Sequence, residues 1–153
     1  MTSGYYRFPT IHDDRVVFVS EDDLWEVDAA GGRARRLTAN PGPSSHPQFS
    51  PDGSRLAYTG RDAGVTEVHV IGADGGEPTR VTFHGALSQV VGWDGDDVVY
   101  SSNAEWPFSN DARLWTVPGS GGVPKLLPWG PARSLARRGR SVRSHRADAS
   151  GRH

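Results

Sequence analysis

Short runs of apolar residues, each ended by a turn, recur along the first 130 residues of the chain. Three of these runs place an aromatic residue directly after two apolar residues: Arg15–Ser20, Arg55–Gly60 and Asp97–Ser102. Short apolar runs bounded by turn residues are typical of β-strands. No window before residue 130 keeps the i, i+3, i+4, i+7 apolar spacing of an amphipathic helix. We therefore predict an all-β fold.

Three glycine pairs set the register of an internal repeat. They are Gly31-Gly32, Gly75-Gly76 and Gly121-Gly122, and they are spaced by 44 and 46 residues. An aliphatic residue stands seven residues before the first glycine of each pair, and another stands six residues after it. These residues are Leu24, Val68 and Leu114, and then Leu37, Val81 and Leu127.

Each copy of the repeat predicts four short strands. In the second copy they span His46–Ser50, Ser54–Gly60, Glu67–Gly72 and Glu77–Thr82. Asp52-Gly53 suits the tight turn between the first two strands, and the glycine pair suits the turn between the last two. Four antiparallel strands in a regular repeat are the signature of a β-propeller blade.

Three blades, at residues 5–38, 46–82 and 88–128, are too few to close a propeller, which has about four to eight. Residues 5–130 are therefore expected to form an incomplete β-propeller of three four-stranded antiparallel blades. The last blade should expose its neighbour-facing side to water. We expect the isolated chain to be marginally stable or prone to aggregation.

The C-terminal segment differs from the rest of the chain in charge. Residues 1–130 carry a net charge of −7, whereas residues 131–153 carry +6. Pro131–Ala136 could begin a fourth blade, but neither a turn nor alternating residues follow. We predict that 131–153 is a basic tail, either disordered or the product of a frameshift. Its arginines could instead bind nucleic-acid phosphates. No aromatic residue interleaves them for base stacking, so we expect no nucleic-acid partner.

Composition excludes several classes of site. The chain has no cysteine, which rules out disulfides, thiolate metal sites and cysteine nucleophiles. No apolar stretch approaches the roughly 18 residues of a membrane span. The N-terminus lacks the basic and apolar regions of a signal peptide. We expect a protein without membrane partners, located in the cytoplasm.

A search for chemistry predicts no catalytic residues, no cofactor and no metal site. The acidic cluster Glu21-Asp22-Asp23 lacks the spacing of a calcium loop. We expect either a solvated loop between strands two and three or a hydrogen bond from Asp23 to turn backbone. Ser50 precedes Pro-Asp-Gly and suits a turn rather than a nucleophile elbow. The six histidines, which show no metal-ligand pairing, are His12, His46, His69, His84, His145 and His153. Of these, His46 and His84 neighbour loops and could reach a central channel.

The tryptophans suit packing better than a peptide-binding surface. Trp25, His69 and Trp115 occupy one equivalent strand position, where packing between blades is the simpler expectation. Trp93 and Trp129 lie outside that position. Trp106-Pro107-Phe108 falls in an insertion between two strands of the third copy, and we expect an exposed loop there that contacts a partner.

Two resemblances follow from these motifs. Ser50-Pro51-Asp52-Gly53, a strand and then a Gly-Gly turn resemble the TolB-like propeller repeat. The longer segment 6–25, with its Pro-x-Ile-His and Ser-Glu-Asp-Asp-Leu-Trp motifs, is similar to the opening of tricorn proteases. Segments 30–38, 75–84 and 127–131 continue that likeness, which covers about residues 5–135 and fails in the tail.

The tricorn resemblance implies a large cytoplasmic serine peptidase. Tricorn proteases carry a six-bladed and a seven-bladed propeller, a PDZ-like domain and a C-terminal catalytic region. They assemble into hexamers and cleave oligopeptides. The resemblance makes this chain part of the first propeller, which filters passage to and from the active site. No position here corresponds to the catalytic residues. The alternative is a TolB-like interaction propeller that belongs to no enzyme.

Overall fold

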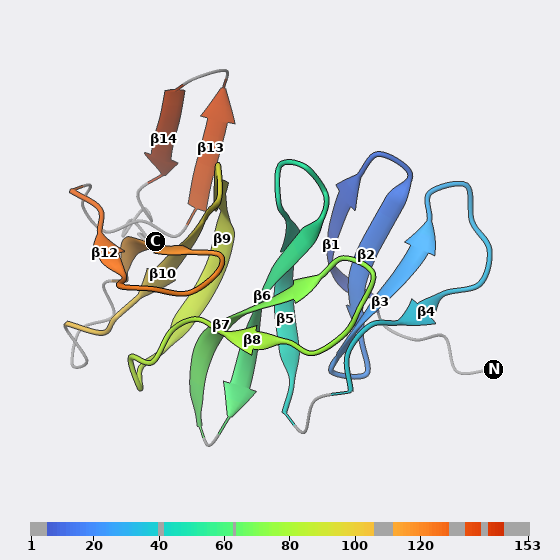
Figure 1. Cartoon of the computed structure of the whole chain (residues 1–153), viewed down its shortest axis with the longest axis horizontal. Coiled ribbons are helices and arrows are strands. Elements are labelled where there is room, and N and C mark those ends of the chain that lie inside the picture. Colours follow the sequence, from blue (N-terminus) through green and yellow to red (C-terminus); the bar gives the residue numbers. More distant parts are fainter. Residues whose placement is uncertain are drawn as a thin grey trace, which may run out of the picture.

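The structure, a computed structural model, describes residues 6–39, 42–62, 64–105, 112–128, 134–138 and 141–145. Three four-stranded antiparallel sheets follow one another along the chain (Figure 1). Blade 1 holds β1 Arg7–His12, β2 Arg15–Ser20, β3 Asp23–Asp28 and β4 Arg35–Arg36. Blade 2 holds β5 Ser44–Phe49, β6 Arg55–Asp62, β7 Val65–Gly72 and β8 Thr79–Arg80. Blade 3 holds β9 Ser88–Asp94, β10 Asp97–Ser102, β11 Arg113–Pro118 and β12 Lys125–Leu126.

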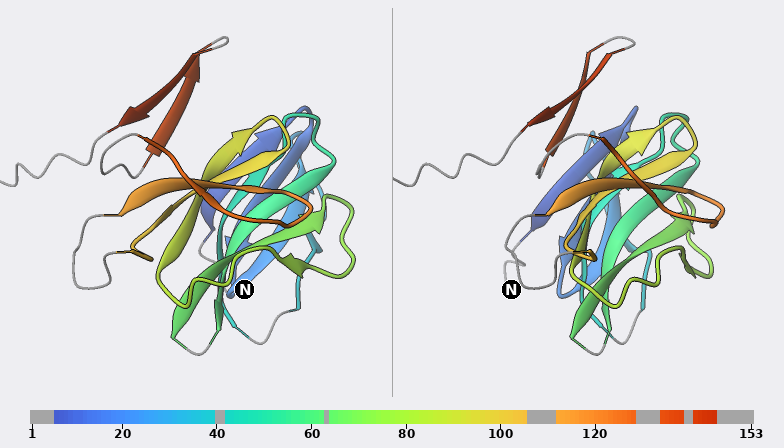
Figure 2. Two further views of the ribbon diagram at one scale, coloured as in Figure 1. Left: turned by 60° about the vertical axis from the view of Figure 1, so that its left-hand side comes forward. Right: turned by 90° about the vertical axis from the view of Figure 1, so that its left-hand side faces the viewer.

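The strands of each blade lie in chain order, and the blades stand side by side (Figure 2). The first strands meet, since β1 contacts β5 and β5 contacts β9. They form the inner edge of the array, while the two-residue strands β4, β8 and β12 lie at its outer edge. This is the arrangement of propeller blades around a channel. The predicted partial β-propeller is confirmed.

Each interface between blades has its own apolar core. Between blades 1 and 2, the side chains of Val17, Val19 and Leu24 pack against Leu56 and Tyr58. The second interface uses equivalent positions. There Ala57 and Val68 of blade 2 pack against Val98, Tyr100 and Val117 of blade 3. A blade therefore uses alternate residues of one strand on its two faces, as the period of two requires.

Within the described residues, no blade packs on one face of blade 1, where only the Tyr6 ring contacts Phe18. The cross-strand pairs Ile11–Val16, Phe49–Leu56 and Trp93–Val98 occupy the same place in blades 1, 2 and 3. Phe49 and Trp93 are 9% and 7% exposed, because the preceding blade covers them, whereas Ile11 is 64% exposed. In a propeller this face of blade 1 is the one that another blade covers.

The outward face of blade 3 is more buried than we predicted. We predicted that the last blade would expose its neighbour-facing side, but Val99 and Leu114 on that side are 1% and 0% exposed. They form a small apolar cluster with Val91 and Leu127. Strand β13, described below, contacts β9 at this edge of the blade.

Two strands lie in the described part of the C-terminal segment. Strands β13 Ser134–Arg138 and β14 Ser141–His145 pair antiparallel and form a separate two-stranded sheet that projects from the blades in Figure 2. Strand pairing uses main-chain groups, and it therefore needs no alternation of side chains. Ser134 follows Leu127 by seven residues, the same interval that brings the chain to the first strands β5 and β9. Thus β13 begins where the first strand of a fourth blade would begin.

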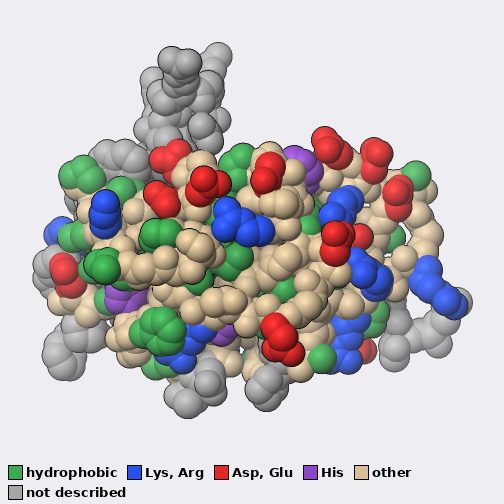
Figure 3. All heavy atoms as spheres, viewed as in Figure 1, with side chains coloured by type: hydrophobic (Ala, Val, Ile, Leu, Met, Phe, Trp, Pro, Cys, Tyr) green, Lys and Arg blue, Asp and Glu red, His purple; other side chains and the backbone are tan. Residues whose placement is uncertain are grey.

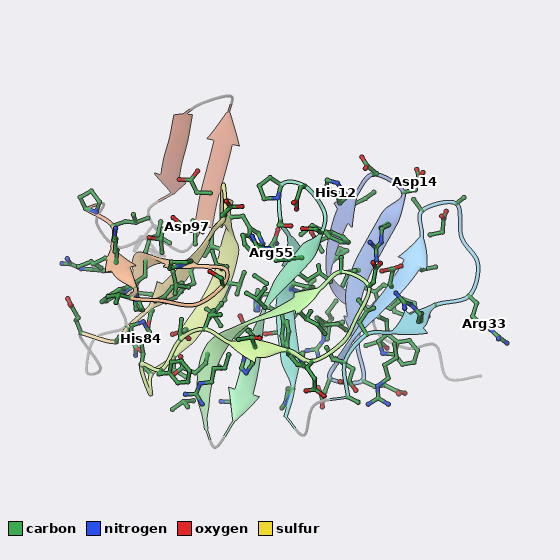
Figure 4. The ribbon with its side chains drawn as sticks, viewed as in Figure 1. His12, Asp14, Arg33, Arg55, His84 and Asp97 are labelled. Carbon is green, nitrogen blue, oxygen red and sulfur yellow. The ribbon has the colours of Figure 1, made fainter. Side chains whose placement is uncertain are left out.

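Arginines connect the rims of the first three blades. The Arg15 guanidinium of blade 1 lies 5.9 Å from the ring centroid of Phe49 in blade 2. Arg55 of blade 2 lies 4.9 Å from the ring centroid of Trp93 in blade 3 and points toward that blade in Figure 4. Contacts of this kind stabilise by roughly 0.5–1 kcal/mol when exposed. The same position of blade 3 holds the exposed Asp97, so a fourth blade would meet the opposite charge.

A buried carboxylate anchors the third strand of blade 1. The Thr38 hydroxyl donates to Asp23 (2.8 Å) and accepts a hydrogen bond from the Leu24 N–H (3.0 Å). Arg36 pairs with the same carboxylate. We had expected Asp23 to bond turn backbone, and its actual partners come from the fourth strand and the residue two beyond it. The sequence could not show this, because the outer strand returns only through the fold.

Blade 2 repeats this arrangement with a glutamate. Glu67 is 2% exposed and accepts from the Thr82 hydroxyl, while its other oxygen accepts from the Gly85 N–H (2.8 Å). The Thr82 hydroxyl accepts from the Val68 N–H (2.8 Å), and Arg80 lies 3.4 Å from the carboxylate. Buried polar groups are thus paired in the way that a low-dielectric interior requires.

Replacing Thr82 tests how far this network stabilises the fold. Thr82→Val removes the hydroxyl, which takes one hydrogen bond from the buried Glu67 carboxylate and leaves the Val68 N–H without a partner. We expect unfolding free energy to fall by about 2–4 kcal/mol. Thr82→Ser keeps the hydroxyl and should lose about 1 kcal/mol or less. Urea unfolding followed by tryptophan fluorescence measures both, and equal losses in the two variants would contradict the assignment.

Candidate functional site

A cavity of about 400 Å³ opens between blades 2 and 3. It lies where β5 and β9 begin and where β6 and β10 end. Hydroxyl and amide side chains dominate the described part of its wall, and none of the described lining residues is Asp, Glu, Lys or Arg. The lining residues are Ser45, His46, Thr59, Thr66, Leu87, Ser88, Gln89, Ser101, Asn103 and Ala112.

Many acidic side chains lie at the opposite end of the strands. They gather along the upper rim in Figure 3, over the turns between the first and second strands of the blades. Exposed carboxylates of these turns are Asp13, Asp14, Asp52 and Asp96. Hydrogen bonds from the Ser54 N–H and from the Ser50 and Ser54 hydroxyls hold the pKa of Asp52 well below its usual range. This end of the strands is rich in carboxylates, while Glu21 and Asp22 are exposed at the end where β2 and β6 finish.

His46 adopts a strained backbone conformation at the cavity wall. Its φ is +52°, and so is that of Phe8 at the equivalent position of β1. Both residues precede a proline and lie where the register of an inner strand shifts. Their rings are 4.1 Å apart between centroids. Positive φ at a bulky residue and bulges in strands both concentrate near functional sites.

The His46 ring is neutral at neutral pH. Burial lowers the pKa of His46 below its ordinary value, because water no longer solvates the charged form. Its Nδ1 lies 2.9 Å from the Ser45 hydroxyl oxygen. The described residues of the cavity wall are therefore uncharged, and most of them are polar.

Hydrogen bonds across the cavity join blade 2 to blade 3. The Thr59 hydroxyl oxygen accepts from the Val90 N–H at 2.9 Å. The Thr66 hydroxyl accepts from the Ser88 N–H and donates to the Ser88 carbonyl, both at 2.7 Å. These side chains substitute for a sheet ladder where the two blades diverge, so the walls are held in place by the blades themselves.

The structure places the residues that we singled out in the sequence at separate locations. His46 lines the cavity, as its position near the inner edge suggested. His84 lies at the lower edge in Figure 4, with its Nε2 2.7 Å from the Tyr100 hydroxyl. Burial, and then the nearby Glu67 charge, raise the pKa of Tyr100 above its ordinary value. His69 stacks on Tyr58 with 5.4 Å between centroids.

The acidic cluster does not form a site. Glu21 and Asp22 are exposed in a turn with φ of +50° and +67°, and Asp23 is engaged as described above. Within the described residues, no group of three or more His, Cys, Asp or Glu side chains could hold a metal ion. The same residues contain no helix long and apolar enough to cross a membrane.

Two of the described tryptophans, Trp93 and Trp115, pack between blades 2 and 3. Trp115 is 8% exposed in the second interface, and the Trp93 indole N–H donates to the Gln48 carbonyl (2.9 Å). The Trp25 indole N–H donates to the Ser20 carbonyl (3.1 Å). The predicted contact loop Trp106-Pro107-Phe108 lies outside the described residues, as do Trp129 and His153. The side chain of His145 is not described either.

Sequence reasoning missed most of the cavity. Apart from His46, none of the lining residues was a candidate, since single Ser, Thr, Asn and Gln residues carry no motif. One signal was present. Ser44, Ser88 and Ser134 each follow the last aliphatic residue of a copy by seven positions, which marks the start of the inner strands.

Comparison with known proteins decides the family. The chain matches the model of the tricorn protease N-terminal β-propeller domain over residues 3–152. It belongs to this family. The sequence resemblance is thereby confirmed, and the match runs through the tail, where we had expected the likeness to end.

Several tricorn relatives match most of the chain. Tricorn protease homolog 1 of Streptomyces coelicolor is 38% identical over 136 residues, which is 87% of this chain and 13% of that protein. A putative tricorn-like protease N-terminal subunit of Sulfurisphaera tokodaii is 30% identical, over 87% of this chain and 70% of that protein. The chain spans only a small part of the Streptomyces relative.

Solved structures agree with these matches. The crystal structure of the tricorn protease superposes with a TM-score of 0.80 at 28% identity, over 89% of this chain and 14% of that one. A putative TolB from Agrobacterium tumefaciens shares the fold, with a TM-score of 0.72 at 20% identity, over 86% of this chain and 49% of that one. TolB of Bordetella pertussis is 36% identical over 55 residues, 35% of this chain and 13% of that protein.

Protonation of His46 should destabilise the fold. Because its folded-state pKa is below the ordinary 6.5, the unfolded chain takes up this proton at a higher pH than the folded one. The stability is fully present above about pH 6.5 and is lost as pH falls through the folded-state pKa. His46→Gln should flatten the dependence of unfolding free energy on pH below that point. Urea unfolding at a series of pH values measures it, and an unchanged slope would exclude His46 as the cause.

Proposed function

We propose that this chain is a non-catalytic part of the propeller of a tricorn-like serine peptidase that degrades oligopeptides. In this proposal the propeller gates the passage of substrate or product. The observation that supports this proposal most strongly is the family match over residues 3–152. The parent is then a cytoplasmic homo-hexamer, and the partners of this chain are its remaining blades, its protease domains and the peptides that pass.

The unpartnered face of blade 1 supports this association. Ile11 is exposed at the position where Phe49 and Trp93 are buried under a preceding blade. Val16 and Val27 of the same face are half-buried, whereas their counterparts in the other blades are fully buried. A further blade would complete this interface. The Sulfurisphaera relative is described as an N-terminal subunit, which supports a partner on a separate chain.

The inner-edge cavity supports passage of peptides. The described residues of its wall carry hydroxyl and amide groups and include no acidic or basic residue. Such a wall does not bind one charge strongly or repel the other, so it suits a path for peptides of varied sequence. The cavity borders β5 and β9, two of the strands that form the inner edge.

The alternative is a TolB-like interaction propeller without an enzyme. The chain shares its fold with TolB structures, but the sequence likeness to TolB covers much less of the chain than the likeness to tricorn proteases does. The tricorn assignment therefore has the stronger support. A TolB-like protein would bind its protein partners without altering any peptidase.

Adding the chain to a truncated relative tests the proposal. Tricorn protease homolog 1 of Streptomyces coelicolor would be prepared without the segment that matches this chain. We expect this chain to bind it and to change its relative rates on short and long fluorogenic peptides. The chain alone should hydrolyse none of them. Binding without any change in length preference would contradict gating, and absence of binding would contradict the association.

A matched pair of variants locates the contact. Ile11→Arg places a charge on the unpartnered face and should weaken binding to the truncated relative about tenfold or more. Val123→Arg makes the same change at a 79% exposed residue in the outer turn of blade 3, and should leave binding unchanged. Equal effects of the two variants on binding would exclude the blade 1 face as the surface that contacts the truncated relative.

A further inference from the structure

We propose that the cavity between blades 2 and 3 is a binding site for a neutral, carbonyl-rich ligand, namely the main chain of an extended peptide. The proposal rests on the passage of peptides suggested above and specifies how this surface would recognise them. It depends on which hydrogen-bonding groups of the wall the fold already uses and which it leaves available.

Three acceptor groups of the wall are engaged by the protein itself, whereas the oxygen of the exposed Gln89 amide is not. The Asn103 side-chain oxygen accepts from the Leu87 N–H (3.0 Å). The hydroxyl oxygens of Thr59 and Thr66 accept from backbone N–H groups of β9. These bonds join the blades, so a ligand cannot take those oxygens without breaking the interface.

The donor groups remain available. Within the described part of the chain, the Asn103 side-chain NH₂ makes no hydrogen bond, and neither does the Gln89 amide, which is exposed. The Thr59 hydroxyl keeps its proton, because its oxygen acts as an acceptor toward Val90. A wall with free N–H and O–H groups selects a ligand rich in acceptors.

The charge of the wall restricts the ligand further. Among the described lining residues there is no Lys or Arg, and the His46 ring is neutral at neutral pH. A carboxylate placed there would lose water without gaining a cation. Peptide carbonyl groups suit the free donors because they are strong acceptors, and they need no cation because they carry no charge. Leu87, which is 54% exposed, and Ala112 provide apolar contact for a small side chain.

Asn103→Asp provides a selective test. It keeps the oxygen that accepts from the Leu87 N–H and replaces the free NH₂ by a second acceptor with a charge. The probe is N-acetyl-trialanine amide, titrated into the full chain and followed by calorimetry and by chemical shifts of Leu87 and Gln89. We expect the variant to bind it at least tenfold more weakly than the parent while unfolding at the same urea concentration. Asp96→Asn, at the opposite rim, should bind like the parent.

A second probe tests the charge selection. N-acetyl-triglutamate amide should bind the parent chain at least tenfold more weakly than the alanine peptide at neutral pH. Equal binding of the two peptides, equal binding by Asn103→Asp, or no binding to the parent would each overturn the proposal. If the truncated relative still responds to the chain in those cases, gating survives and only this site fails. If the peptide binds here and the relative does not respond, the proposed function fails instead.

Discussion

The packing of one blade face against the next is the interaction on which the structure depends. A short four-stranded sheet is stable only when both of its faces are covered, because alternate residues of each strand point to opposite sides. Leu24, Val68 and Leu114 are all fully buried at equivalent positions. Each such burial contributes about 1.5–3 kcal/mol. Stability thus accumulates interface by interface, as in other repeat proteins.

The polar features follow from that packing. Apolar side chains fill the middle of each interface, so hydroxyl, amide and charged groups collect at the two ends of the strands. At one end, Arg15 and Arg55 lie over the aromatic rings of the next blade. At the other end, Thr59 and Thr66 bond the backbone of β9 where the blades separate. The cavity is the space left by this separation.

The outward faces of the first and last blades, blade 1 and blade 3, are chemically different. Blade 1 presents Ile11 and an unpartnered face, which a further blade would bury. Blade 3 carries Asp97 where the earlier blades carry arginine, and β13 already contacts its inner strand. The position of β13 fits the start of a fourth blade. The repeat is therefore regular in its apolar core and varied in its rim charges, which distinguish one interface from the next.

The sequence by itself determined the repeat, the strand content and the family. Paired glycines and aliphatic residues at fixed offsets define turns and buried strand positions locally, and no distant contact is needed to detect them. The tertiary structure decided the partners: Asp23 with Thr38, Arg55 with Trp93, and Asn103 with the backbone of Leu87. These contacts join residues far apart in the chain or in different blades, and their residue types form no motif. His46 could be suspected from the sequence, but its positive φ, which Phe8 shares in β1, and its place at the cavity wall appear only in the structure.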